Sequence, residues 1–119
     1  FSEAYSMIDL AIGDQVMQVL GQQRPATERV RLFLAARDIA IATSKPTQLS
    51  IRNMLSVTIT DIAPLTGQMR GLVAVHLTVN GSGERLCAHI SKAACEALNL
   101  QLGAEVFALI KSARISTPA

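Results

Sequence analysis

Aromatic side chains are scarce in this sequence. Its 119 residues include three phenylalanines, one tyrosine and no tryptophan, although half of them are hydrophobic. A single domain of this length buries a modest core, and that core must be built from aliphatic side chains. Proteins that bind single-stranded nucleic acid need aromatic platforms in a cationic groove, and a formal net charge of +2 supplies no such groove. Both shortages argue against a nucleic-acid partner.

Cysteine and long apolar runs are scarce as well. Cys87 and Cys95 are too few for a disulfide scaffold, so a reducing cytoplasm is the expected compartment. No apolar run reaches the roughly eighteen residues that cross a membrane, and no signal-like block opens the chain. The chain begins at Phe1 rather than at methionine, which suggests a fragment of a longer protein.

Patterns typical of catalysis and of metal binding are also missing. The serines have no neighbouring His-Asp pattern, there is no G-x-x-x-x-G-K-[ST] phosphate loop, and the carboxylates are scattered singly. His76, Cys87 and His89 are possible metal ligands, but zinc needs four ligands at recognisable spacings, and Cys95 falls on a predicted helix. We therefore predict no enzyme activity, no ATP hydrolysis, no cofactor and no metal site for this chain.

Alternating apolar and polar residues predict strands in the first part of the chain. In order, these are a β-hairpin of residues 7–12 and 15–20 around Gly13-Asp14, a loop at residues 21–28, a strand from Arg29 to Ala36, an interruption at Arg37-Asp38, and renewed alternation at Ile39 and Ile41. Residues 44–49 contain Pro46 and few apolar groups, so they are interpreted as a linker.

The alternation is cleaner after the linker. The predicted elements are a strand with Leu55, Val57 and Ile59 on one face, a turn at residues 64–67, a strand at 71–79, a hairpin turn at Asn80-Gly81, a strand at 84–90, a helix from Lys92 to Leu98 with Ser91 as its N-cap, and a last strand from Glu105 to Ser112.

These elements predict an all-β fold. Five short strands with one short helix before the final strand suit a small closed OB-like barrel better than a sandwich, and the helix is expected to close one end. We predict two regions: residues 1–46 form the additional strands and hairpin of an accessory region, and residues 47–119 form the barrel.

Two pairs of a hydroxyl and a cation stand at the edges of predicted strands. Ser50-Ile51-Arg52-Asn53 opens one strand, and Ile110-Lys111-Ser112 closes another. A small oxyanion needs fixed donors in place of its hydration shell; arginine supplies a fork of donors, lysine a compact charge and serine neutral donors. The residues alone leave open that Arg52 and Lys111 are ordinary surface cations and that Ser91 only caps a helix.

The same residues resemble a known module. "SIRN" at the start of a strand, followed after about sixty residues by "LIKS", is similar to the molybdate-binding Mop (TOBE-type) module, and in particular to the C-terminal regulatory domain of the ATP-binding subunit of molybdate ABC importers. "RLFLAARDIAIATSKPTQLSIRN" extends the likeness upstream, because those ATPases carry a similar "ARD" strand before the motif. The likeness covers residues 31–116 well and the first thirty residues only loosely.

The resemblance implies a site for molybdate or tungstate between two subunits. It would use the S-x-R end of one copy together with the I-K-S strand and the helix start of the other, and the residues so implied are Ser50, Arg52, Ser91, Lys111 and Ser112. The chain departs from the pattern at Ala94, where related proteins often carry a second hydroxyl. One neutral donor is thereby lost, while the two cations remain.

The resemblance also implies a role. The chain would be a cytoplasmic regulatory domain, peripheral to the inner membrane, that forms a homodimer, acts with the permease subunits of the importer and inhibits transport by feedback when the imported oxyanion binds. Two other interpretations remain open. One is a structural dimerisation domain without ligand, and the other is a free-standing molybdate-storage protein.

Overall fold

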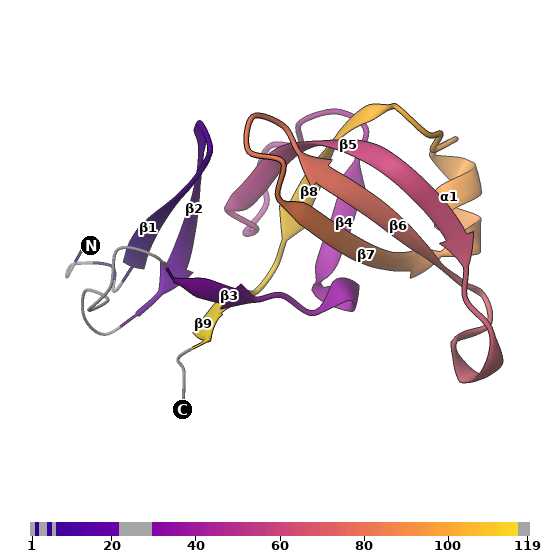
Figure 1. Ribbon diagram of the computed structural model, residues 1–119, viewed down its shortest axis with the longest axis horizontal. Helices are drawn as coiled ribbons and strands as arrows, with labels where there is room; N and C mark the ends of the chain where they lie inside the picture. Colours follow the sequence, from indigo (N-terminus) through magenta and orange to yellow (C-terminus); the bar gives the residue numbers. More distant parts are fainter. Residues whose placement is uncertain (1, 3–4, 6, 22–29, 117–119) are drawn as a thin grey trace.

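The computed structural model describes residues 2, 5, 7–21 and 30–116, with the main chain alone at residues 114–116. A hairpin and a strongly curled sheet lie side by side (Figure 1). The elements are β1 Met7–Ile12, β2 Gln15–Leu20, β3 Arg31–Phe33, the 3-10 helix η1 Ala36–Asp38, β4 Ile39–Ala42, β5 Asn53–Pro64, the 3-10 helix η2 Gly67–Met69, β6 Leu72–Val79, β7 Arg85–Ser91, α1 Lys92–Ala97, β8 Glu105–Ile110 and β9 Arg114–Ser116.

The main sheet has five antiparallel strands in the order β4-β8-β5-β6-β7. It curls until β7 contacts both β4 and η1, which brings its two edges together (Figure 1). A bulge between Ile59 and Asp61 interrupts the β5–β6 register, and bulges of this kind increase the local twist of a strand. The predicted all-β, OB-like barrel with one short helix is therefore confirmed.

The inside of the barrel is aliphatic, as the composition predicts. Leu55, Val57 and Ile59 alternate inward along β5 and are buried, and β6 contributes a matching buried row. Each such side chain stabilises the fold by about 1.5–3 kcal/mol relative to an exposed position. Helix α1 lies where β7 ends (Figure 1), and Cys95 together with Leu100 just beyond it joins the core. The helix therefore covers one end of the barrel.

The predicted turns and the predicted helix cap lie at the expected residues. The hairpin of β1 and β2 has the predicted strand bounds, and Ile12 pairs with Gln15 across its turn. Gly81, at φ 89°, lies in the tight connection from β6 to β7. The Ser91 side chain caps α1 by accepting a hydrogen bond from the Ala94 N–H at 3.0 Å, which confirms the predicted N-cap.

Several predicted element ends differ from the structure by one residue or more. The strand expected up to Ala36 ends at Phe33 in the described residues, because the Asp38 N–H bonds the Ala35 carbonyl at 2.9 Å and closes a 3-10 turn; its expected start at Arg29 lies outside them. The strand expected to end at Ser112 ends at Ile110, where the chain leaves the sheet and then forms β9, which pairs with β3. Helix α1 stops at Ala97 because the chain turns left-handed two residues later.

The β1–β2 hairpin packs against the barrel through β2. Met17 is completely buried and belongs to the same core cluster as the barrel residues. The turn of the hairpin lies against the turn between β6 and β7, since a Cβ added to Gly13 would lie 2.8 Å from the Gly81 carbonyl oxygen. The boundary at residue 46 stays a prediction; β4, which precedes it, pairs with β8, which follows it.

Two side-chain amides, instead of main-chain hydrogen bonds, connect β2 to β5. The Asn53 side chain accepts a hydrogen bond from the Gln18 N–H at 2.8 Å and donates one to the Gln18 carbonyl at 2.7 Å. Three residues along, the Gln15 side chain accepts from the Ser56 N–H at 2.7 Å and donates to the Ser56 carbonyl at 3.0 Å. Because an amide has the same donor and acceptor groups as a peptide unit, these bridges satisfy both strand edges.

Candidate oxyanion site

The two candidate cations lie at the same end of the β5–β8 ladder. Asn53 and Ile110 are register partners in its last rung. Arg52 immediately precedes Asn53 and Lys111 immediately follows Ile110. The two basic residues therefore lie side by side at the same end of two adjacent strands. Both side chains are exposed, and neither forms a hydrogen bond or an ion pair within the described residues. Two neighbouring cations without such partners suit a small dianion.

The two serines of the motifs lie near the same end of the β5–β8 ladder. Ser50 is two residues upstream of Arg52, and Ser112 directly follows Lys111; both are exposed. The Lys111 N–H donates to the Asp38 carbonyl at 3.1 Å, so the main chain at Lys111 is bonded to η1. The sequence alone did not indicate that both motifs lie at the same end of the β5–β8 ladder within one chain.

Asp38 would compete with a bound oxyanion for the hydroxyl proton of Ser112. The Ser112 hydroxyl donates to Asp38 Oδ2 at 3.2 Å, across a sequence separation of 74 residues. A serine hydroxyl has one proton, so Ser112 cannot donate to an oxyanion while it makes this bond. A hollow of about 240 Å³ adjoins the pair and is lined by Phe33, Ala35, Asp38, Ser112 and Ala113.

Ser91 lies at the other end of the sheet. It is the register partner of Leu72 at the start of β6, next to the rung in which Val73 pairs with Pro64 at the far end of β5. The structure therefore puts Arg52, Lys111 and Ser112 at one end of the sheet, with Ser50 two residues upstream of Arg52, and it puts Ser91 at the other end. Its hydroxyl oxygen accepts the capping bond from Ala94, which leaves its proton available to another acceptor.

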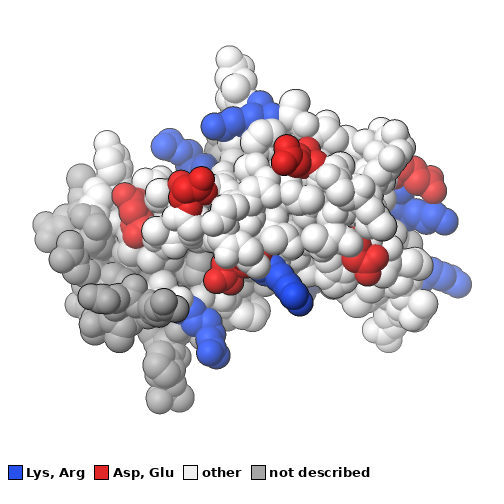
Figure 2. Space-filling view, turned by 45° about the horizontal axis from the view of Figure 1, so that its top comes forward, with Lys and Arg blue, Asp and Glu red and all other residues white. Residues whose placement is uncertain are grey.

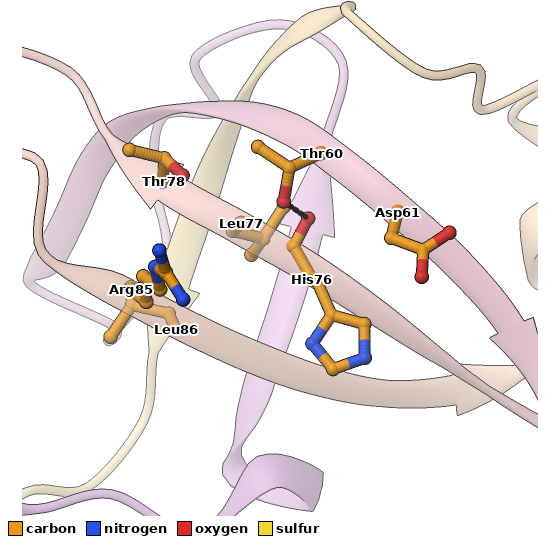
Figure 3. A pocket seen from close by; sticks show the side chains of 7 residues that line it. All are labelled: Thr60, Asp61, His76, Leu77, Thr78, Arg85 and Leu86. Atoms are coloured by element: carbon orange, nitrogen blue, oxygen red, sulfur yellow. Dashed lines mark hydrogen bonds between the residues drawn. The ribbon is translucent and has the colours of Figure 1, made fainter.

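A second hollow is less suited to a dianion. It measures about 350 Å³ on the outer face of β5, β6 and β7, where Asp61, His76 and Arg85 come from three adjacent strands (Figure 3). The Thr60 hydroxyl donates to the His76 carbonyl at 3.2 Å, which is the one bond drawn across its floor. The Asp61 carboxylate in the lining would repel an oxyanion that Arg85 attracts.

Charge and possible metal ligands are dispersed over the described part of the chain. Figure 2 shows basic and acidic side chains scattered singly over the visible face, without an extended region of one sign. No group of three or more His, Cys, Asp or Glu residues there could hold a metal ion. Burial raises the pKa of the Cys87 thiol, so less thiolate is present at a given pH. None of the described helices has the length and apolarity to cross a membrane.

Comparisons with known proteins agree on one family. The family model described as the TOBE domain matches residues 49–116. The molybdenum import ATP-binding protein ModC of Brucella abortus (strain 2308) is 31% identical over 119 residues, which are 100% of this chain and 32% of that protein. ModC of Mesorhizobium japonicum is 39% identical over 112 residues, which are 92% of this chain and 28% of that protein. The chain thus spans about a third of the length of these relatives.

A solved structure is similar as well. It is a crystal structure of the cytoplasmic molybdate-binding protein ModG with molybdate bound. The TM-score is 0.62 at 27% sequence identity, and the likeness covers 73% of this chain and 60% of that one. At this sequence identity the similarity extends beyond the fold alone.

Proposed function

This chain belongs to the TOBE domain family, and we propose that it binds molybdate or tungstate as a regulatory domain of the ATP-binding subunit of a molybdate importer. The observation that carries the proposal is the pair Arg52 and Lys111 at one end of the β5–β8 ladder, with no internal ion-pair partner among the described residues. The names of the relatives, molybdenum import proteins and a molybdate-binding protein, supply the identity of the anion.

The chemistry of the site is replacement of a hydration shell. A tetrahedral dianion gives up bound water only where fixed donors take its place. Arg52 offers a planar fork and Lys111 a point charge, so together they neutralise both negative charges. Ser50 and Ser112 add hydroxyl donors, the second once it leaves Asp38. The two cations provide most of the attraction, and the hydroxyls set the geometry.

We further propose that two copies complete the site. Ser91 lies at the opposite end of its own sheet, so it reaches an oxyanion held by Arg52 and Lys111 only from a second copy. The chain would then form a homodimer with two equivalent sites. Four donors would come from one copy and the start of α1 from the other. This differs from the division that the family resemblance implies, because Lys111 and Ser112 lie beside Arg52 of their own chain.

A mixed-dimer experiment tests this arrangement. Arg52→Ala removes a cation, while Ser91→Asp keeps an N-cap but brings a carboxylate toward the anion. Each variant alone should bind no molybdate. Mixed in equal amounts and refolded, they should recover binding in heterodimers, because one site then holds an intact Arg52 and an intact Ser91. Absence of any recovery, in a mixture shown to contain heterodimers, would contradict the shared site.

Regulation follows from linkage. An anion that binds only when two domains are docked stabilises the docked arrangement, and the attached ATP-binding subunits would be biased toward an inactive geometry. Imported molybdate would thereby inhibit its own transport. In this proposal the domain works in the cytoplasm, and its parent subunit meets the membrane through the permease subunits of the importer.

Thermal melting of the 119-residue chain tests the function directly. A site filled to a hundred times its dissociation constant adds about 2.7 kcal/mol, or roughly several degrees for a domain of this size. We expect that shift with molybdate and with tungstate, and no comparable shift with sulfate. A melting point that ignores all three anions would favour the alternative, a structural dimerisation domain without ligand, to which the engaged Ser112 hydroxyl and the missing donor at Ala94 lend support. Saturable binding by a stable monomer would instead contradict the site shared between two copies.

A further inference from the structure

Residues 53–56 of β5 are held by a strand ladder on one side only. Their partners on β8 run from Ile110 to Phe107, whereas pairing with β6 begins only at Val57. The open side faces β2. The side-chain bridges from Asn53 and Gln15 close it, together with the bond from the Asn80 N–H to the Ser56 carbonyl at 3.0 Å. At Asn53 itself, the hydrogen bonds on this side are those of its own amide to Gln18.

Asn53 occupies the critical position among these residues. Its main chain forms the last rung with Ile110, its side chain holds both polar main-chain groups of Gln18, and the next residue toward the N-terminus is Arg52. Residues 50–52 themselves lie outside any strand. Whatever fixes the main chain at Asn53 therefore sets the starting point and direction of the Arg52 side chain.

We infer that Asn53 is a positioning residue for the oxyanion site, and that through Asn53 the β1–β2 hairpin is coupled to anion affinity. This inference rests on the proposed function. Without the Asn53 amide, the end of β5 is free to fray, and an arriving anion must first order it. Fixing the main chain and the arginine again carries an entropic cost, so the dissociation constant should rise roughly tenfold. By reciprocity, a bound anion strengthens the attachment of the hairpin.

Gln15 provides a matched control. Its side chain makes three hydrogen bonds, to the Ser56 N–H and carbonyl and to the Asn80 carbonyl at 2.9 Å, and it attaches the same two strands. It acts three residues farther from Arg52, where β5 is about to gain β6 as a neighbour. Asn53→Ala and Gln15→Ala should therefore both lower the melting temperature, but only Asn53→Ala should weaken anion binding.

The experiment is a titration of the wild-type chain, Asn53→Ala and Gln15→Ala with sodium molybdate, well below all three melting temperatures. We expect about tenfold weaker binding for Asn53→Ala and a change of less than about twofold for Gln15→Ala. Equal losses in the two variants, or unchanged affinity in Asn53→Ala, would overturn the inference while leaving the proposed function intact. Failure of the wild-type chain to bind molybdate would overturn both.

Hydrogen exchange gives a second measurement that needs no variant. In the wild-type chain, molybdate should slow the exchange of the Gln18 N–H, because that proton is held by Asn53. A merely structural bridge predicts that exchange of the Gln18 N–H slows no more than exchange of the barrel-core amides, which global stabilisation by the anion also slows. An unchanged Gln18 rate in the presence of saturating molybdate would therefore contradict the coupling, even if Asn53→Ala were too unstable to study.

Discussion

Replacing Met17 by alanine measures how firmly the β1–β2 hairpin belongs to the barrel. Met17 has no exposed surface and lies in the core cluster with residues of β5, β6 and β8. A two-stranded hairpin alone is at best marginally stable in water, so its order depends on this packing. Truncating a buried methionine costs about 2–5 kcal/mol, a large part of a total stability of about 5–15 kcal/mol.

The neighbouring position on the same strand is the control. Val16 points away from the barrel and is 59% exposed, so Val16→Ala should change stability by less than about 0.5 kcal/mol. Urea unfolding followed by circular dichroism should show a lower midpoint for Met17→Ala with an unchanged slope, and its melting temperature should fall by roughly 10 °C. Equal, small effects of the two substitutions would refute a shared core. So would a wild-type chain that unfolds in two separate steps.

Three further predictions concern the site, the turns and a cysteine. Asp38→Asn should strengthen molybdate binding severalfold, because it removes a nearby negative charge and loosens its hold on the Ser112 hydroxyl. In a Ser112→Ala background only the part due to the charge should remain, so an equal gain there would contradict the competition for the hydroxyl. Gly13→Ala should lower the melting temperature more than Gly83→Ala, since both glycines have positive φ but only the added Cβ at Gly13 meets main-chain atoms, those of Gly81; equal losses would contradict that contact. Because burial raises the pKa of the Cys87 thiol, less thiolate is present at a given pH, and iodoacetamide should alkylate Cys87 more slowly in the folded chain than in urea; equal rates at about pH 8 would contradict its protection.

Local chemistry explains which structural features were predictable. The Asn80-Gly81 turn, the cap by Ser91 and the inward row of Leu55, Val57 and Ile59 each depend on residues within a few positions of one another. Their signals are therefore complete in the sequence. The aliphatic composition likewise predicted the core, because no other side chains were abundant enough to fill it.

Contacts between distant segments were not predictable in the same way. The pairing of β3 with β9 and the bond from Ser112 to Asp38 join residues more than seventy positions apart, and no local pattern marks them. The "SIRN" motif drew attention to Arg52, but nothing in the sequence indicated that Asn53 would bond the main chain of a hairpin 35 residues upstream. A side chain that bonds the main chain of another strand produces no periodic pattern in the sequence.

The role of Ser91 shows the same limit. The sequence identified it as a helix cap and, by resemblance, as an anion ligand, and the fold assigns it to the end of the sheet remote from Arg52. Both roles are compatible only if a second copy supplies the serine. The candidate site residues thus remain a prediction, and their division between two copies remains a proposal.

Equilibrium dialysis with molybdate tests the central claim that Arg52 and Lys111 together bind one oxyanion. The wild-type chain should bind one molybdate per chain, and Arg52→Ala and Lys111→Ala should each abolish binding while their melting temperatures without anion stay near that of the wild type, because both side chains are exposed and lack partners among the described residues. Undiminished binding in both variants would contradict the account.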